Sequence, residues 1–260
     1  MSTDGFDDGS VWNEFQWESH LNEIERRSEQ LRRFITSDPK GKTPRWITLL
    51  QESLDELDAV EAFIEEELLL DEAYFPEDED EWEDDEDEFD DDDFFFKDST
   101  FPFYNDEEDD DEEDLDYGED WKELSDDFTL SDYGSIENLE IYQDARTYAV
   151  DVLKWAEMIP RQMQNKHVHE YITNVLKITA KLAGGYSFGF EQDVLGGNIA
   201  YTKKALYSAN AALSHMHYIK KQPFLNSREY SIFHERLFEL RNDIGIYVQE
   251  LRDRFQLGFE

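Results

Sequence analysis

Apolar side chains recur every three or four positions through the second half of the chain, which is the spacing of one helical face. Four such stretches follow one another, at residues 139–159, 167–183, 195–216 and 227–251. Pro160 ends the first stretch, and Pro223 precedes the last. Because the connections between the stretches are short, we expect residues 136–260 to fold as an antiparallel four-helix bundle.

Local signals mark two of the expected helix ends. Gly184 and Gly185 follow the second stretch and predict that the helix stops there. Asn226 and Glu229 have the spacing of a capping box and predict the start of the fourth helix. The third stretch is rich in alanine and serine, so we place its helix centrally, where it is covered on several sides, including by another subunit.

Residues 11–70 show a looser helical periodicity that is interrupted at Ser37–Pro44. We expect a helical hairpin here, within an N-terminal domain at residues 1–70. The predicted fold class is therefore all-α, with this hairpin and the bundle separated by a third segment.

Charge is concentrated in that third segment. The formal charge of the whole chain is -42, yet residues 136–260 hold 15 acidic and 15 basic residues. Residues 71–135 hold 34 acidic residues and two lysines. Such dense like charge opposes compaction, so we expect residues 71–135 to be a disordered linker, which we call the acidic segment.

The acidic segment is also unusually aromatic, since it contains 14 of the 38 aromatic residues of the chain. Alternation of acidic and aromatic residues is typical of segments that insert rings into a partner while carboxylates face its basic surface. The alternative is a solubilising spacer whose rings dock on its own domain. The residues expected to bind a partner are Trp82, Phe89, Phe94, Phe95, Phe96, Phe101, Phe103, Tyr104 and Trp121.

The sequence offers little chemistry for catalysis. It has no cysteine, no glycine-rich phosphate loop and no HExxH motif. His215 and His217 are two positions apart, as are His167 and His169, so neither pair can share a metal ion on one helix. We therefore predict no enzyme activity, no catalytic residue, no cofactor and no metal site.

The loop at residues 186–190 is the most site-like element of the bundle. Its aromatic residues Tyr186, Phe188 and Phe190 are candidates for an oligomer contact, and the alternative is packing on the N-terminal hairpin. No apolar run approaches the roughly 20 residues of a membrane helix. We expect a cytoplasmic protein that does not bind membranes, whose acidic charge favours basic partners.

The helical pattern of the second half resembles a bacterial four-helix-bundle family. This family includes the large-subunit rRNA intervening-sequence proteins and the accessory variability proteins of diversity-generating retroelements. Ala183, Gly185 and Tyr186 match the family's second-helix motif, and the chain differs at Lys181, Gly184 and Phe188. Thr202 and Lys203 stand where the family has a Gly-Ser pair on the third helix.

The resemblance covers about 120 residues and implies a pentameric ring with a non-enzymatic role. In the retroelement branch the ring is basic and assists a reverse transcriptase with its RNA. The bundle of this chain is electrically neutral, so direct nucleic-acid binding is not expected.

Three functions remain open. In the first, an oligomeric adaptor recruits a basic protein, such as a nucleic-acid-processing enzyme, through the acidic segment. In the second, the polyanion mimics nucleic acid and inhibits a partner. In the third, the chain binds RNA or DNA directly as a reverse-transcriptase accessory protein, which requires a basic stripe on the bundle. The candidates for such a stripe are Lys203, Lys204, Lys220, Lys221 and Arg228.

Overall fold

A computed structural model describes residues 11–35, 43–72 and 134–257. The nine aromatic residues from Trp82 to Trp121 lie outside these described residues, as does nearly all of the acidic segment. Every regular element within the described ranges is a helix, so the expected all-α fold is confirmed for them.

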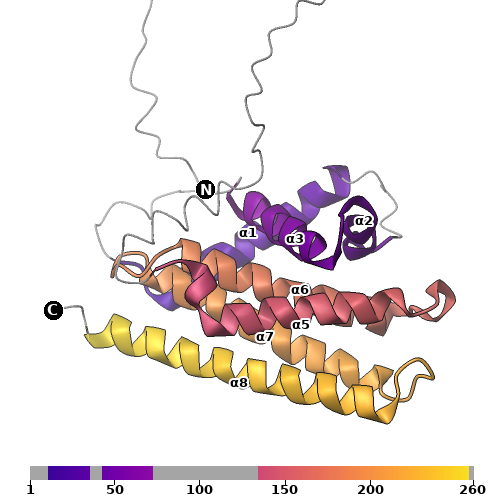
Figure 1. The fold of residues 1–260 in the computed structure, drawn as a ribbon. Helices are drawn as coiled ribbons and strands as arrows, with labels where there is room; N and C mark the ends of the chain where they lie inside the picture. The colour runs from indigo at the N-terminus through magenta and orange to yellow at the C-terminus, as the bar shows by residue number, and fades with distance from the viewer. Residues whose placement is uncertain (1–10, 36–42, 73–133, 258–260) are drawn as a thin grey trace, which may run out of the picture.

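Four long helices form the C-terminal part of the fold. Residues 134–257 contain η3 (Ile136–Asn138), α5 (Glu140–Glu157), η4 (Arg161–Met163), α6 (Lys166–Ser187), α7 (Leu195–Ile219) and α8 (Ser227–Leu257). Successive long helices run in opposite directions (Figure 1). Each packs on the next, and α8 returns to contact α5. The four-helix bundle is our interpretation of this packing.

The start of α8 follows the predicted capping box. The backbone N–H of Glu229 donates to Oδ1 of Asn226 at 2.9 Å, and the backbone N–H of Asn226 donates to Oε2 of Glu229 at 3.2 Å. These two bonds satisfy amide groups that would otherwise lack partners at a helix start.

The predicted end of the second helix is wrong. Instead of stopping at Gly184 and Gly185, α6 continues through both to Ser187. A Cβ atom added to Gly184 would lie 3.0 Å from the Tyr201 ring, and one added to Gly185 would lie 3.1 Å from the Thr202 hydroxyl. The glycines therefore allow close contact between α6 and α7, and tertiary packing overrides the local stop signal.

The described residues of the N-terminal half, 11–35 and 43–72, form three helices that lie over one side of the C-terminal ones (Figure 1). They are α1 (Glu14–Ile35), α2 (Arg45–Glu52) and α3 (Glu56–Glu72). The second helix of the expected hairpin is thus divided at Ser53–Asp55. The carboxylate of Asp55 accepts the backbone N–H groups of Leu57 and Asp58, so it caps α3 and favours a new helix start.

The main hydrophobic core joins the two halves of the chain. Trp46 and Leu49 of α2, and Val60, Phe63 and Ile64 of α3, are buried in the same cluster as the apolar faces of α5 to α8. Among the residues of α1 whose side chains are described, 14–26, none is buried in this cluster. Its Leu21 and Ile24 form a second, smaller cluster with residues of α7.

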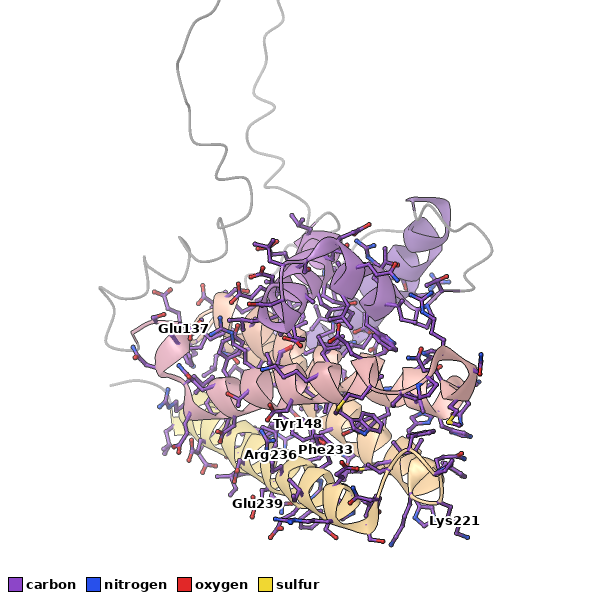
Figure 2. The ribbon with its side chains drawn as sticks, turned by 45° about the vertical axis from the view of Figure 1, so that its right-hand side comes forward. Glu137, Tyr148, Lys221, Phe233, Arg236 and Glu239 are labelled. Carbon is purple, nitrogen blue, oxygen red and sulfur yellow. The ribbon has the colours of Figure 1, made fainter. Side chains whose placement is uncertain are left out.

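A polar seam lies inside the contact between α5 and α8 (Figure 2). The hydroxyl of Tyr148 lies 2.6 Å from the hydroxyl of Tyr171 and donates to the carbonyl of Phe233 at 3.0 Å. The guanidinium of Arg236 lies 5.1 Å from the centre of the Tyr148 ring. Burial raises the pKa of Tyr148 well above its ordinary value, so this tyrosine stays neutral and holds α5, α6 and α8 together.

Candidate functional site

Four basic side chains of the C-terminal helices gather beneath α1. We call them the cationic face: Lys181 on α6, Lys203 and Lys204 on α7, and Arg252 on α8. The three lysines are 2%, 8% and 7% exposed, respectively. Burial of charged side chains is unfavourable unless each is paired, so the partners of these lysines define the site.

One half of the cationic face pairs with the first turns of α1. The ammonium of Lys203 lies 2.6 Å from Oε2 of Glu18 and 3.7 Å from Oε1 of Glu14. Arg252 donates two hydrogen bonds to the carboxylate of Glu14, at 2.7 and 2.8 Å. This two-point geometry fixes the position of Glu14 as well as its charge.

The other half pairs with the middle of α1 and with α3. The ammonium of Lys204 lies 2.8 Å from Oε2 of Glu25 and donates to the side chain of Asn22 at 2.8 Å. The ammonium of Lys181 lies 3.3 Å from Oε1 of Glu25 and 3.7 Å from Oε2 of Glu67. Glu25 thus bridges α6 and α7, and Glu67 adds a buried carboxylate from α3.

These pairs shift the acidity of the carboxyl groups. The hydrogen bond from Arg252 and the charge of Lys203 lower the pKa of Glu14, against the effect of burial. Burial alone would raise the pKa of Glu25, but the charges of Lys181 and Lys204 lower it overall. Both groups therefore favour the folded state in their ionised form.

The sign of these shifts predicts a pH dependence. A carboxyl group with a lowered pKa in the folded state stabilises the fold above its unfolded pKa of about 4.3 and loses that contribution as the pH falls through its folded value. We expect the denaturation midpoint of the wild-type chain to fall more steeply below pH 5 than that of a Glu14→Gln/Glu25→Gln variant. Chemical denaturation at pH 7, 5, 4 and 3, followed by circular dichroism, measures the difference. Parallel curves for the two proteins would contradict this electrostatic role.

Beside the cationic face, Ala200, Tyr201 and Phe188 form an apolar strip that α1 contacts. Leu21 and Ile24 of α1 pack against Ala200 and Tyr201 of α7. The ring of Trp17 stands edge-on to the ring of Phe188, with 5.1 Å between the ring centroids. Helix α1 therefore meets the C-terminal helices through alternating charged and apolar contacts.

A glycine lets the start of α1 approach α7 closely. A Cβ atom added to Gly196 would lie 2.6 Å from the carbonyl oxygen of Trp12 and 2.8 Å from Cδ1 of Trp17. No side chain fits there without moving the backbone at Trp12, just before α1, and the ring of Trp17. This position therefore controls the docking of α1 by shape, independently of charge.

The three aromatic residues of the loop at residues 186–190 all pack against other residues of the same chain. Tyr186 and Phe190 are buried in the main core, and their rings stand edge-on to each other. Phe188 packs on Trp17 and on Tyr201. Within one chain, Tyr186 and Phe190 therefore pack in the main core, and Phe188 packs against α1. An oligomer contact through these three residues stays a prediction.

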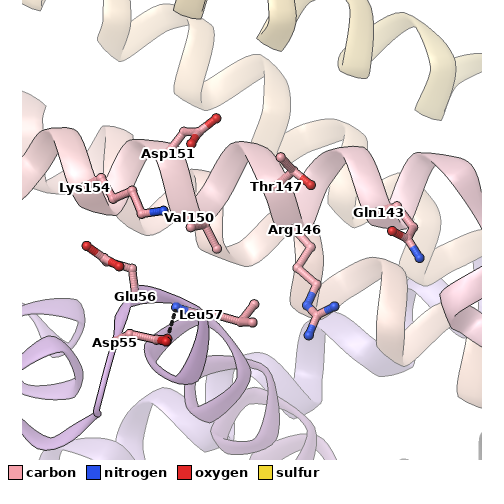
Figure 3. A pocket seen from close by; sticks show the side chains of 9 residues that line it. All are labelled: Asp55, Glu56, Leu57, Gln143, Arg146, Thr147, Val150, Asp151 and Lys154. Carbon is pink, nitrogen blue, oxygen red and sulfur yellow. Dashed lines mark hydrogen bonds between the residues drawn. The ribbon is translucent and has the colours of Figure 1, made fainter.

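An open cleft of about 440 Å³ lies between α3 and α5 (Figure 3). Several of its polar side chains have structural partners. Arg146 pairs with Glu61 and Glu137, while Asp151 accepts a hydrogen bond from Arg236 at 2.7 Å. The residues that line the cleft are Asp55, Glu56, Leu57, Gln143, Arg146, Thr147, Val150, Asp151 and Lys154. The ion pair between Arg146 and Glu61 holds α3 against α5.

Two histidines from different helices meet near the end of α7. Nδ1 of His167 lies 3.2 Å from Nδ1 of His215, and the ring of Tyr218 stacks on His167. Sequence spacing within each helix did not reveal this pair, which antiparallel packing of α6 and α7 creates. Among the residues that the structure describes, no three histidine, aspartate or glutamate side chains gather into a metal site.

Sequence reasoning also missed the ion pairs beneath α1. Lys203 and Lys204 were candidates for the basic stripe that direct nucleic-acid binding requires, and the structure places both nearly buried under α1. Lys220, another candidate, lies over the ring of Tyr230. The sequence holds one signal that could have indicated burial: Lys203 and Lys204 are adjacent within an alanine-rich helix that was itself expected to be covered on several sides.

No helix in the described parts of the chain is long and apolar enough to cross a membrane. None of the protein-family models, curated proteins or solved structures compared with this chain matches it. The resemblance to the bacterial four-helix-bundle family therefore stays an expectation that rests on sequence pattern.

Proposed function

We propose that this chain is a non-enzymatic, homo-oligomeric adaptor whose acidic segment binds a basic protein partner. The observation that carries the proposal is the placement of the two flanks of that segment. On one flank, Glu67 of α3 lies 3.7 Å from Lys181. On the other, the hydroxyl of Tyr186 donates to the carbonyl of Gly134.

Lys181 and Tyr186 belong to the last turns of α6, about 7–8 Å apart along the helix axis. The fold thus fixes both flanks of the acidic segment near one end of one helix. The sequence places 34 acidic residues in the segment between these flanks, which is a high concentration of negative charge along the chain. Such a concentration attracts a basic surface over a distance of about one Debye length, roughly 8 Å at physiological ionic strength.

The described fold also supports a protein partner over direct binding of nucleic acid. The nearly buried lysines of α6 and α7 already pair with carboxylates of α1 and α3. Nucleic-acid affinity depends on lysines and arginines that are available to neutralise phosphates. The charge of the acidic segment would add repulsion.

A pull-down with the full chain tests the proposal. We expect capture of a basic protein, and we expect loss of that capture when residues 73–133 are replaced by a Gly/Ser linker of about 10 residues, which spans roughly 17 Å. Circular dichroism of the shortened chain checks that the helices remain. Capture that survives the replacement would contradict the role of the acidic segment.

A second variant separates an adaptor from a nucleic-acid mimic. It replaces the nine partner-binding aromatic residues, Trp82 to Trp121, by serine and leaves every charge in place. An adaptor that inserts rings into its partner should lose capture, whereas a mimic that acts through charge should retain it. The mass of the wild-type chain in solution, measured by light scattering, tests the expected homo-oligomer.

A further inference from the structure

Helix α1 is attached to the fold differently from α2 and α3. The buried side chains of α2 and α3 belong to the main core, but those of α1 form the separate small cluster with Ala200 and Tyr201. The other contacts described for α1 include its ion pairs and hydrogen bonds to the cationic face, the ring contact between Trp17 and Phe188, and a contact with α3. Helix α1 can therefore leave without opening the main core, which α2 and α3 cannot do.

The surface that such a departure would uncover has a definite chemistry. It holds the four cations of the cationic face, with Glu67 as the carboxylate that stays beside Lys181. The apolar strip of Ala200, Tyr201 and Phe188 runs next to these charges. A ligand for this surface needs negative groups and apolar groups in alternation along one side.

We propose that the cationic face with its apolar strip is a binding site for an amphipathic helix of a partner protein that presents carboxylates and apolar side chains on one side, and that α1 is a built-in competitor for this site. The site is distinct from the acidic segment, so this proposal does not depend on the function proposed above.

Helix α1 itself shows what the surface accepts. Its carboxylates at positions 14, 18 and 25 and its apolar residues at positions 21 and 24 follow helical spacing, so they lie on one side of the helix. The carboxylates contact the cationic face, and Leu21 and Ile24 contact the apolar strip. This combination is the helix-in-groove mode of recognition, in which spaced anchors set specificity.

Two observations favour a helix over a nucleic acid as the partner ligand. Phosphates could pair with the lysines but would leave Tyr201 and Phe188 without apolar contacts. The chain carries a formal charge of -42, which repels a polyanion at long range. A helix such as α1, with five acidic and four basic residues, has nearly no net charge and avoids that repulsion.

The covalent link makes α1 a strong competitor. A tethered segment acts at an effective concentration on the order of millimolar, so a free helix must displace α1 before it can bind. The apparent affinity of the site for a partner helix is reduced by the fraction of molecules in which α1 is docked. Weakening α1 alone should therefore increase binding of a free helix.

A fluorescein-labelled synthetic peptide of residues 11–35 serves as the probe. We expect it to bind the full chain carrying Glu14→Gln, Glu18→Gln and Glu25→Gln at least about tenfold more tightly than it binds the wild-type chain, measured by fluorescence anisotropy. A peptide with the same three glutamines is the control for charge and should not bind. Equal binding to the wild-type and substituted chains would overturn the competitor role of α1.

Two glycine substitutions in the opened chain test where the peptide binds. Adding Gly196→Ala should weaken peptide binding at least about tenfold, because a side chain there clashes with the start of the docked helix. Adding Gly245→Ala, which places a methyl group with no atom within 4 Å, should leave binding unchanged. Unchanged binding in the Gly196→Ala chain would place the peptide elsewhere and overturn the site.

A parallel titration with a single-stranded RNA oligonucleotide decides between classes of ligand. We expect no binding to the opened chain. If RNA bound and binding disappeared on adding Lys203→Gln and Lys204→Gln, while the peptide failed to bind, the site would be one for phosphates and the helix proposal would be overturned. Failure of both probes would show that the cationic face has only a structural role.

Discussion

The Ile64→Ala substitution is expected to lower the free energy of unfolding by about 2–5 kcal/mol, because it deletes methyl groups from a fully buried side chain and leaves a cavity. Ile64 belongs to the same hydrophobic cluster as residues of α5 to α8. The C-terminal helices should therefore lose stability together with α3. Denaturant unfolding followed by circular dichroism should show one transition, shifted to lower denaturant concentration.

Leu69→Ala on the same helix provides the matched control. Leu69 is largely exposed, so its truncation should change the free energy of unfolding by no more than about 0.5 kcal/mol. If residues 1–70 folded as an independent domain, Ile64→Ala would shift only a minor transition and leave the main one in place. That result would contradict the shared core.

The Lys181→Met substitution is expected to destabilise the fold by about 3–5 kcal/mol at neutral pH, as breaking a buried ion pair usually does. Methionine keeps most of the volume but leaves the buried carboxylate of Glu67 without this cation, and it removes one of the two lysines that pair with Glu25. Thermal and chemical denaturation measure the loss.

Two further variants show whether the loss comes from charge. Lys181→Met combined with Glu67→Gln should recover part of the stability, because the buried negative charge is removed with its partner. Lys154→Met on the exposed face of α5 should change stability by less than about 1 kcal/mol, as exposed charges usually do. Additive effects of the Lys181 and Glu67 substitutions would contradict direct coupling between them.

Helix ends could be predicted from the sequence where the residues that fix the end lie next to it in the chain. The start of α8 was found because Asn226 and Glu229 are three residues apart and bond to each other. The end of α6 was missed because Gly184 and Gly185 look like a stop signal locally, while contacts with Tyr201 and Thr202 decide their conformation. A local rule gives the wrong answer where a distant residue determines the packing.

The candidate site could not be predicted for the same reason. Lys203 and Glu18 form a 2.6 Å ion pair although they are 185 positions apart in the chain. Spacing within either helix contains no information about that partner, and a lysine on a helix is most often solvated. Lys203 and Lys204 were named only as candidates for a basic stripe, and only the packing of α1 shows that they are buried.

The core shared by α3 and the C-terminal helices has a consequence for synthesis of the chain. Val60 and Ile64 leave the ribosome before the residues of α6 that belong to the same core, such as Leu176, have been made. At roughly 5–20 residues per second, that interval lasts on the order of ten seconds. The acidic segment is translated within this interval. Repulsion between the carboxylates of different incomplete chains would oppose their aggregation through the exposed apolar faces of α2 and α3.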